Sequence, residues 1–351
     1  MNNIITIADG AGGEKMDHLI KKTVLKYFEK NGGKIDVPLS ELDDSAVING
    51  IVFSTDTHTV QPLFFPGGNI GSLAVAGTVN DVSVMGAKPL ALSTGFVIEE
   101  GFSKSDFERI IATMAEMAEK ADVPIVTGDT KVVEKGALQE MIINTSGIGV
   151  RTPLLDSNIE EVRRYREYKG EWLLDSNLEE GDKIIVSGRI GDHGVALLSF
   201  REGYGFESKI KSDVAPVNGL IEKALKAGGV TTAKDPTRGG LSNTLNEISE
   251  KSGVGIIVYE EKIPVSNDVK AACEMLGIDP LEIGNEGKVV LGVVKEKAEE
   301  VLDSIKKHPL GKNAEIIGEA RSDVKGVLME TIVGGRRVLH KPIGDPIPRI
   351  C

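Results

Sequence analysis

The sequence is poor in the residues that mark several classes of protein. It has only two cysteines, Cys273 and Cys351, in 351 residues. Two cysteines cannot form a disulfide framework or a cysteine zinc site, which predicts a protein of the reducing cytoplasm. Since the sequence has no run of about 18 apolar residues, we expect no membrane span. The amino terminus also lacks the basic region and apolar core of a signal peptide.

An excess of positive charge is missing as well. The chain has 53 acidic and 41 basic side chains, which give a formal net charge of −12. Such a surface repels the phosphate backbone, and this argues against nucleic acid as the main partner. A protein of this charge that binds phosphates must use metal ions or backbone amides rather than a basic surface.

Strand-like runs alternate with amphipathic helices, which predicts an α/β fold of two domains. The first domain, residues 1–151, has predicted strands at 51–60, 89–99, 123–133 and 141–150 and predicted helices at 69–87 and 103–121. The second domain, residues 181–338, has predicted strands at 181–190, 254–263, 288–294, 314–320 and 326–333, with helices at 215–228, 238–252, 267–277 and 295–307. Residues 339–351 form a predicted flexible tail.

Residues 152–180 are predicted to link the two domains. The octapeptide LLDSNIEE at 154–161 recurs almost unchanged as LLDSNLEE at 173–180. Between the two copies, the charged run IEEVRRYREYK predicts an exposed helix that stops at Gly170. We interpret this segment as a surface insertion that arose by duplication.

Six short segments rich in glycine and acidic residues lie next to predicted element ends: DGAGGEK (9–15), DDSA (43–46), TVNDVSVMGA (78–87), TGDTK (127–131), DPTRGG (235–240) and GNEGK (284–288). Each alone is typical of a turn, but their number favours a binding site. Mg²⁺ held by carboxylates could bind a nucleoside triphosphate to such an acidic chain. The candidate ligands are Asp44, Asp81 and Asp235, with Asp56 beside them. A P-loop is absent, and the lack of G-x-G-x-x-G disfavours a dinucleotide site.

These segments together resemble a known superfamily. In order and spacing, DDSA, STDT (54–57), GTVNDVSVMGA (77–87), TGDTK and DPTRGG are similar to the aminoimidazole-ribonucleotide synthetase, or PurM-like, superfamily. Within it, DGAGGEKM, PLFFPGGNIG (62–71), GDHG (191–194), GNEGK and the terminal PRIC resemble the HypE family of hydrogenase maturation proteins. The resemblance covers nearly the whole chain, and the segment 154–173 is its main departure.

The resemblance implies a function for the chain. Two subunits would pair through their N-terminal strands, with ATP and Mg²⁺ as cofactors. The terminal cysteine would receive a carbamoyl group from the carbamoyltransferase HypF, and the group would be dehydrated to a thiocyanate. The cyanide would then reach the iron of a [NiFe] hydrogenase through a HypC–HypD complex. The implied nucleotide-binding residues are Gly10, Gly12, Gly13, Asp56, Asn80, Asp129 and Thr130.

The chemistry of this dehydration indicates roles for further residues. Lys131 is the candidate cation near the γ-phosphate, and Glu286 is the candidate base for the amide protons. His193, at a predicted helix start, could bind or shuttle protons. Cys273 lies on an apolar helix face and is predicted to be a core residue.

The tail is suited to carry a group on Cys351. Pro342, Pro346 and Pro348 disfavour a helix, and eleven extended residues reach about 34 Å. The terminal carboxylate should raise the pKa of the Cys351 thiol, and Arg349 would partly offset that effect.

Other functions remain open at this stage. A synthetase or kinase of the same superfamily would act on a small diffusible substrate and would turn over ATP without Cys351. A scaffold would dock a partner through the tail and show no dependence on nucleotide. A redox or metal-delivery role for the thiol is disfavoured, because no second cysteine or histidine lies nearby in the sequence.

Overall fold

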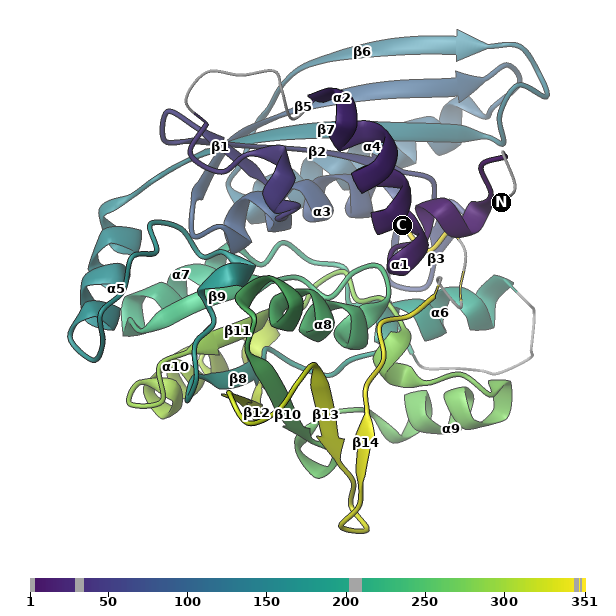
Figure 1. Cartoon of the computed structure of the whole chain (residues 1–351). Coiled ribbons are helices and arrows are strands. Elements are labelled where there is room, and N and C mark those ends of the chain that lie inside the picture. Colours follow the sequence, from purple (N-terminus) through teal and green to yellow (C-terminus); the bar gives the residue numbers. More distant parts are fainter. Residues whose placement is uncertain (1–3, 29–34, 202–209, 344–346, 348) are drawn as a thin grey trace.

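Two β-sheets and the helices packed on them make up the structure (Figure 1), a computed structural model that describes residues 4–28, 35–201, 210–343, 347 and 349–351. The five-stranded sheet has the order β1-β2-β7-β5-β6. Its strands are β1 (Ala46–Ile48), β2 (Ile51–His58), β5 (Lys88–Glu99), β6 (Ile125–Val133) and β7 (Met141–Val150). All neighbours pair antiparallel except β5 and β6, which are parallel and joined by α4 (Lys104–Ala121). A ribbon of β3 (Phe64–Phe65) and β4 (Gly68–Asn69) precedes the next helix.

The helix α3 (Ile70–Val84) lies between the two sheets. The side chain of Asn69 caps it by accepting hydrogen bonds from the backbone N–H groups of Gly71 and Ser72. The helix contacts β2, β5 and β7 on one side and α7 (Asn218–Ala227) and β9 (Val230–Lys234) on the other. Every residue of α3 except Asp81 is buried. Asp81 and the buried Gly77 are the residues of this helix that line a cavity described below.

One face of the five-stranded sheet is open. Along β7, residues from Met141 to Gly149 alternate between buried and partly exposed, so every second side chain points away from α3. We call this open side the outer face. It includes Phe53, which is 46% exposed, and its register partner Ile148, which is 40% exposed.

The seven-stranded sheet has the order β14-β13-β10-β12-β8-β11-β9. Besides β9, it contains β8 (Lys183–Val186), β10 (Gly255–Tyr259), β11 (Val290–Val293), β12 (Glu315–Arg321), β13 (Val327–Glu330) and β14 (Arg336–Val338). One apolar core joins this sheet to α5 (Pro153–Arg163), α7 and α10 (Ala298–Lys306), and another joins it to α8 (Gly240–Ser252). The two-domain α/β fold expected from the sequence is confirmed, but the short strands β1, β9 and β14 were not predicted.

Shorter helices complete the described chain. α6 (Asp192–Arg201) packs on α9 (Asn267–Leu276), where the predicted core position of Cys273 is confirmed. The remaining turns are η1 (Ile7–Gly10), α1 (Glu14–Leu19), η2 (Ile20–Val24), α2 (Leu25–Phe28), η3 (Leu39–Glu41), η4 (Asp175–Asn177), η5 (Glu260–Lys262), η6 (Pro280–Glu282) and η7 (Pro309–Gly311). Within the ranges described, no helix is long and apolar enough to span a membrane.

The prediction of an exposed helix that stops at Gly170 is wrong. α5 ends at Arg163, and its residues Leu155, Ile159 and Val162 are buried in the core beside the seven-stranded sheet. Trp172 in the second half of the segment is also buried there. The many charged residues of this segment suggested exposure, but their side chains form ion pairs at the rim of the core while the apolar residues between them point inward.

Both ends of the chain lie near the junction of the two sheets (Figure 1). Residues 4–28, which we call the N-terminal segment, contact the tail. A Cβ atom at Gly13, whose φ is +74°, would lie 2.1 Å from the carbonyl oxygen of Pro342. The Nζ atom of Lys341 donates a hydrogen bond of 2.7 Å to Asp17. The described part of the tail is thus packed against the body of the protein.

Candidate active site

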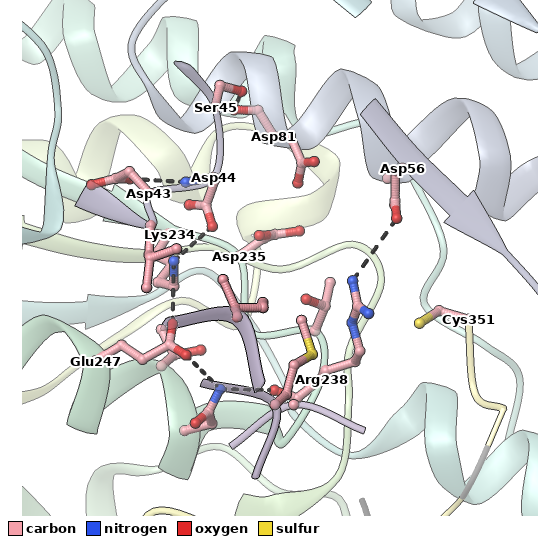
Figure 2. Close-up of a pocket in the computed structure, with 18 of the residues that line it drawn as sticks. Asp43, Asp44, Ser45, Asp56, Asp81, Lys234, Asp235, Arg238, Glu247 and Cys351 are labelled. Carbon is pink, nitrogen blue, oxygen red and sulfur yellow. Dashed lines mark hydrogen bonds and ion pairs between the residues drawn. The ribbon is translucent and has the colours of Figure 1, made fainter. Parts of the chain in front are cut away.

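A cavity of about 300 Å³ lies between the five-stranded sheet, the N-terminal segment and α8 (Figure 2). Its walls come from parts of the chain that are far apart in sequence, so it exists only in the folded molecule. The cavity brings together seven residues that the sequence singled out, namely Gly12, Asp44, Asp56, Asp81, Asp235, Glu286 and Cys351.

Carboxylates dominate the cavity wall. Asp44 precedes β1, Asp56 lies on β2, Asp81 on α3, and Asp235 follows β9. Burial, followed by the negative charge of Asp44, raises the pKa of Asp235 to about 8. Burial and the charge of Asp235 likewise raise the pKa of Asp81 well above its usual range, although Ser54 donates a 2.8 Å hydrogen bond to it. Such a group of buried carboxylates favours a bound cation.

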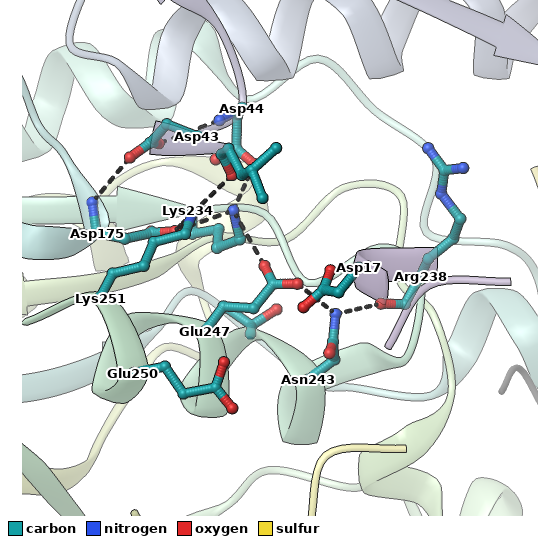
Figure 3. Close-up of polar contacts among 12 residues, drawn as sticks. Asp17, Asp43, Asp44, Asp175, Lys234, Arg238, Asn243, Glu247, Glu250 and Lys251 are labelled. Carbon is teal, nitrogen blue, oxygen red and sulfur yellow. Dashed lines mark hydrogen bonds and ion pairs between the residues drawn. The ribbon is translucent and has the colours of Figure 1, made fainter. Parts of the chain in front are cut away.

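One buried lysine supplies part of the compensating charge. The Nζ atom of Lys234 lies 2.6 Å from Asp44, 3.2 Å from Asp175 and 3.4 Å from Glu247 (Figure 3). Burial acts to lower the pKa of Lys234, but these carboxylates outweigh it and hold the pKa well above its usual value. Lys251 also binds Asp175, at 2.7 Å. The network ties the first domain, the linker and α8 together behind the cavity.

The carboxylates fit a metal ion that arrives with a phosphate group. In the described part of the chain, no three acidic, histidine or cysteine side chains are arranged as a ready metal centre. However, the Oδ2 atoms of Asp44 and Asp235 are buried without a hydrogen-bond partner. Carboxylate oxygens are the protein ligands that Mg²⁺ prefers, and Mg²⁺ completes its shell with phosphate oxygens and water. The donor set therefore suits Mg²⁺ bound to a nucleotide better than a cage made of protein alone.

Glu286 reaches the cavity from a tightly bonded loop. Its backbone N–H donates to Asp213, 3.1 Å away, and its backbone carbonyl accepts from Asn80, 3.3 Å away. Its side chain is 3% exposed, and Oε1 has no hydrogen-bond partner in the described structure. Burial, reinforced by Asp235 and Asp56, raises the pKa of Glu286 well above its usual range. A carboxylate so placed can accept a proton from a group inside the cavity.

Arg238 is the cation at the other end of the cavity, next to the chain terminus. Its guanidinium lies 3.9 Å from Asp56 and is 38% exposed (Figure 2). The negative charge at Cys351 is the largest of the effects that raise the pKa of Arg238. The carboxylate of Asp56 is also 3.3 Å from Nε2 of the buried His58, within ion-pair distance. Neither ring nitrogen of His58 has a hydrogen-bond partner in the described structure. Burial would raise the pKa of Asp56, but His58 and Arg238 together hold it below the usual value.

The terminal Cys351 is docked at the cavity. Its terminal carboxylate accepts a hydrogen bond of 3.0 Å from the backbone N–H of Thr59, just after β2. In Figure 2 its sulfur points toward Arg238 and the cavity. The sequence expected Arg349 beside the terminus, but its guanidinium binds the carbonyl of Thr59 and the side chain of Gln139. Arg238 is the arginine that faces Cys351 instead.

His193 lies behind the cavity rather than in its wall. The ring is fully buried, and burial lowers its pKa. Nδ1 is 2.7 Å from the hydroxyl of Ser212, and Nε2 is 2.8 Å from the carbonyl oxygen of Ile350. Both ring nitrogens are thus engaged, one of them with the tail.

The predicted nucleotide residues Gly10, Gly12, Gly13 and Asn80 do not lie together. Gly12 lines the cavity, Gly10 lines a smaller pocket beside Cys351, and Gly13 packs on Pro342. Asn80 is buried behind the cavity, where its side chain accepts from the backbone of Val217 and supports the loop of Glu286.

Asp129, Thr130 and Lys131 lie away from the cavity of their own chain. All three are exposed on β6, at the edge of the sheet. Three strand spacings, about 14 Å in all, separate β6 from β2. Lys131 pairs with Val97, whose side of the sheet is the outer face. Within one chain, Lys131 is therefore too far from Cys351 for direct contact.

Sequence reasoning missed Lys234, Arg238 and His58. Each is adjacent to a segment that was singled out, since Lys234 precedes DPTRGG, Arg238 belongs to it, and His58 follows STDT. A lysine followed directly by an acidic segment was the available signal, because a cation must accompany carboxylates that are buried together.

Comparison with known proteins places the chain among relatives over its whole length. The family model "AIR synthase related protein, N-terminal domain" matches residues 42–151, and the corresponding C-terminal domain model matches residues 179–329. A hydrogenase expression/formation protein of Methanocaldococcus jannaschii is 52% identical over 99% of this chain and 99% of its own length. A carbamoyl dehydratase HypE of Azotobacter vinelandii is 43% identical over 100% of this chain and 98% of its own.

Solved structures agree with these relatives. The crystal structure of a HypE–HypF complex contains a chain with a TM-score of 0.83 and 48% identity, covering 92% of this chain and 99% of that one. A crystal structure of HypE in complex with ATP has a TM-score of 0.79 and 40% identity, covering 99% of this chain and 100% of that one.

Proposed function

Because the chain belongs to the HypE family of carbamoyl dehydratases, within the AIR synthase related proteins, we propose that it dehydrates a carbamoyl group carried on its own Cys351. The product is a thiocyanate on the same sulfur, which serves as the source of the cyanide ligand in [NiFe] hydrogenase maturation. The observation that carries the proposal is the position of Cys351, the last residue, at a cavity that also contains Asp56, Asp235 and Glu286.

The reaction balances with one ATP for each group. The S-carbamoyl group, R–S–C(O)NH₂, loses its oxygen and two protons and becomes R–S–C≡N. The oxygen leaves with the γ-phosphoryl group as inorganic phosphate, and ADP is the other product. Phosphoryl transfer is needed because an amide oxygen does not leave unaided. The two N–H protons must pass to bases as the triple bond forms.

The cavity is suited to a nucleotide. Met16, Ile20, Leu39 and Leu42 give one part of its wall an apolar character that fits a purine ring. Asp44, Asp81 and Asp235 would hold Mg²⁺, which when bound neutralises the phosphate charge and orients the phosphates. Arg238 would attract phosphate oxygens from the side of Cys351.

Glu286 is the proposed base for the amide protons. Its unpartnered Oε1 and its burial leave it free to accept a proton, and its raised pKa makes it a stronger base than an exposed glutamate. In the loaded site, the positive charges of the metal ion and Arg238 would favour its ionised form, so that it could act near neutral pH.

We further propose that the chain acts as a homodimer. The outer face carries Phe53 and Ile148 at 46% and 40% exposure, together with Ile51 at the start of β2. Burying these three apolar side chains against a second copy of the chain is favourable. In a C2 dimer, the outer face of one subunit would pack against the outer face of the other. The β6 edge of the partner would then be the source of Lys131, Asp129 and Thr130 for each cavity.

The carbamoyl donor and the cyanide acceptor are proposed by relation to the family. A carbamoyltransferase of the HypF type would load Cys351, in keeping with the known complex between a HypE and a HypF. A HypC–HypD complex would receive the cyanide. Both transfers require Cys351 to be exposed to another protein at some stage, which the position of the thiol at the chain end allows.

Intact mass spectrometry tests the function directly. The chain is loaded by a HypF-type carbamoyltransferase and then treated with Mg²⁺ and ATP. We expect one carbamoyl group on the C-terminal peptide and then the loss of one water that depends on ATP. Cys351→Ser should show neither change, whereas Cys273→Ser should show both.

Two other outcomes would refute the proposal. Steady hydrolysis of ATP without a change of mass would indicate a synthetase or kinase with a diffusible substrate. Partner binding that ignores nucleotide, with no mass change, would indicate a scaffold.

A further inference from the structure

The last residues of the tail lie beside the segment that follows β2. The N–H of Thr59 donates to the terminal carboxylate of Cys351 at 3.0 Å, and the N–H of Gln61 donates to the carbonyl of Arg349 at 3.2 Å. The chain bends between these contacts, since the φ of Arg349 is +56°. The carbonyl of Ile350 lies between them in sequence and is buried, so it needs a donor of its own.

His193 is that donor. A carbonyl oxygen only accepts, so the proton of the neutral ring is on Nε2, 2.8 Å from Ile350. Nδ1 then accepts from the hydroxyl of Ser212 at 2.7 Å, which fixes the tautomer. Phe65 packs edge-on against the ring with centroids 5.6 Å apart. The imidazole is held on three sides and has no nitrogen left for another group.

Two glycines make room for the side chain of Ile350. A Cβ atom at Gly194 would lie 3.1 Å from Cδ1 of Ile350 and 3.1 Å from Cδ1 of Ile347. A Cβ atom at Gly284 would lie 3.2 Å from Cδ1 of Ile350. The side chains of Ile347 and Ile350 are almost completely buried, at 1% and 2% exposure. Thus GDHG and GNEGK, which the sequence singled out as glycine-rich segments, each contribute a glycine to the site of this isoleucine.

From these contacts we infer that His193 is a positioning residue, which fixes the register of the docked tail and thereby places the sulfur of Cys351 at the cavity. Of the two roles that the sequence left open for His193, binding or proton shuttling, this is a binding role, and its ligand is the chain's own penultimate carbonyl. Ile350 is buried beside Gly194 and Gly284, where a Cβ atom would also collide with Ile283 at 2.1 Å or with the carbonyl of Thr237 at 2.7 Å. The inference deepens the proposed function, because it concerns how the carrier is presented.

The contribution of His193 has an expected size. Removing its Nε2–H leaves the Ile350 carbonyl buried without a partner in the docked state, whereas water can solvate it in the undocked state. The equilibrium for docking should therefore fall by about 5- to 150-fold. A slip of the tail by one residue would also move Cys351 away from the carboxylates, because consecutive Cα atoms are about 3.8 Å apart.

Two substitutions separate the hydrogen bonds of the ring. In His193→Gln, the amide nitrogen can take the place of Nε2 and still donate to Ile350. In His193→Asn, the shorter side chain reaches only the place of Nδ1, so the bond to Ile350 is lost while that to Ser212 can persist. Both variants remove the same ring from the core, so they form a matched pair in which the packing loss is shared.

Hydrogen exchange of the full-length protein, followed by mass spectrometry, gives a readout remote from the substitution. The N–H groups of Thr59 and Gln61 donate to main-chain oxygens of Cys351 and Arg349, so their protection reports docking. A chain that ends at residue 348 supplies the fully undocked reference. We expect His193→Gln to keep most of the parent's protection, and His193→Asn to lose it by about 5- to 150-fold. Equal protection in the two variants, or parental protection in His193→Asn, would overturn the inference.

Single-turnover dehydration of the loaded protein supplies the functional arm. We expect His193→Asn to lower the first-order rate constant while the ATP concentration for half saturation stays unchanged, with rescue in His193→Gln. A change in the ATP requirement alone would contradict a positioning role. If even the parent shows no dehydration, the proposed function fails, but the exchange experiment still decides the role of His193.

Discussion

The ion pair between Arg166 and Asp182 gives a test of how the linker stabilises the fold. The guanidinium donates bonds of 2.6 and 3.1 Å to the two oxygens of Asp182, which is 1% exposed. Arg166 itself is 17% exposed. In Arg166→Met, Asp182 would keep its bonds from the hydroxyl of Thr231 and the N–H of Glu179. It would lose its ion pair with Arg166, the one it makes among the described residues. An exposed linker would tolerate this change.

The expected loss is large for one residue. Breaking a buried ion pair by removing one partner costs about 3–5 kcal/mol. Since Asp182 keeps two donors and water reaches Arg166, we expect about 3 kcal/mol. At about 2 °C per kcal/mol for a chain of this size, the melting temperature should fall by about 6 °C. Arg164→Met is the matched control, because Arg164 is 72% exposed and its pair with Glu161 lies at the surface.

The loss should depend on pH in a defined direction. Burial already raises the pKa of Asp182 above its unfolded value, although Arg166 acts to lower it. Without Arg166 the folded-state pKa rises further, so the folded variant binds a proton that the unfolded chain lacks. Its stability is then lost as the pH rises through that pKa. We expect the difference in melting temperature from the parent to be larger at pH 8 than at pH 5.

Thermal unfolding at the two pH values measures the effect. A variant that melts with the parent at pH 8 would refute the claim that this pair anchors the linker. A loss of equal size at both pH values would assign the effect to packing of the arginine side chain rather than to its charge.

Three further predictions concern the site and the assembly. Lys234→Met should lower the free energy of unfolding in urea by about 3–5 kcal/mol, because it leaves Asp44 and Asp175 without their shared cation. The control Lys226→Met, at a side chain 54% exposed, should change it little. Glu286→Gln should slow single-turnover dehydration about 100-fold or more, and a parental rate would exclude Glu286 as the base. It should not lower the melting temperature at pH 8, because burial and the neighbouring Asp235 already favour the neutral form of Glu286. Phe53→Asp should halve the mass seen by light scattering, whereas Val333→Asp, at a hairpin tip 93% exposed, should not; a parental mass for Phe53→Asp would count against the outer face as the interface.

The sequence was sufficient for elements whose pattern is local. α4 was predicted from its periodic apolar residues and from Ser103, whose side chain caps it by accepting from Asp106. The metal candidates Asp44, Asp81 and Asp235 were found from their positions at strand and helix ends, and these ends do meet at one cavity. Both inferences depended on local patterns, namely apolar periodicity with a helix cap and acidic residues near the ends of elements.

The sequence was insufficient where distant segments decide the outcome. Lys234 reads as an ordinary charged residue at the end of a short strand, and only Asp44 and Asp175, from two other segments, make its burial favourable. The linker reads as exposed because charged residues surround Ile159 and Val162, although these two point into the core. For Lys131 the difficulty is of another kind, since a single chain does not contain the surroundings proposed for it.

The docking of the tail has a consequence for how fast the protein can work. In the proposed function, a group borne on Cys351 would not be captured from solution, because the tether would keep it near the cavity at an effective concentration in the mM range. The site therefore needs no affinity for a free thiocarbamate. In the proposed cycle the same sulfur also visits other proteins, so the hydrogen bonds of the tail with His193 and Thr59 must be neither too weak nor too strong. If docking of the tail is too weak, the group on Cys351 would spend most of its time in solvent. If docking is too strong, release of the tail would become the slow step of the cycle.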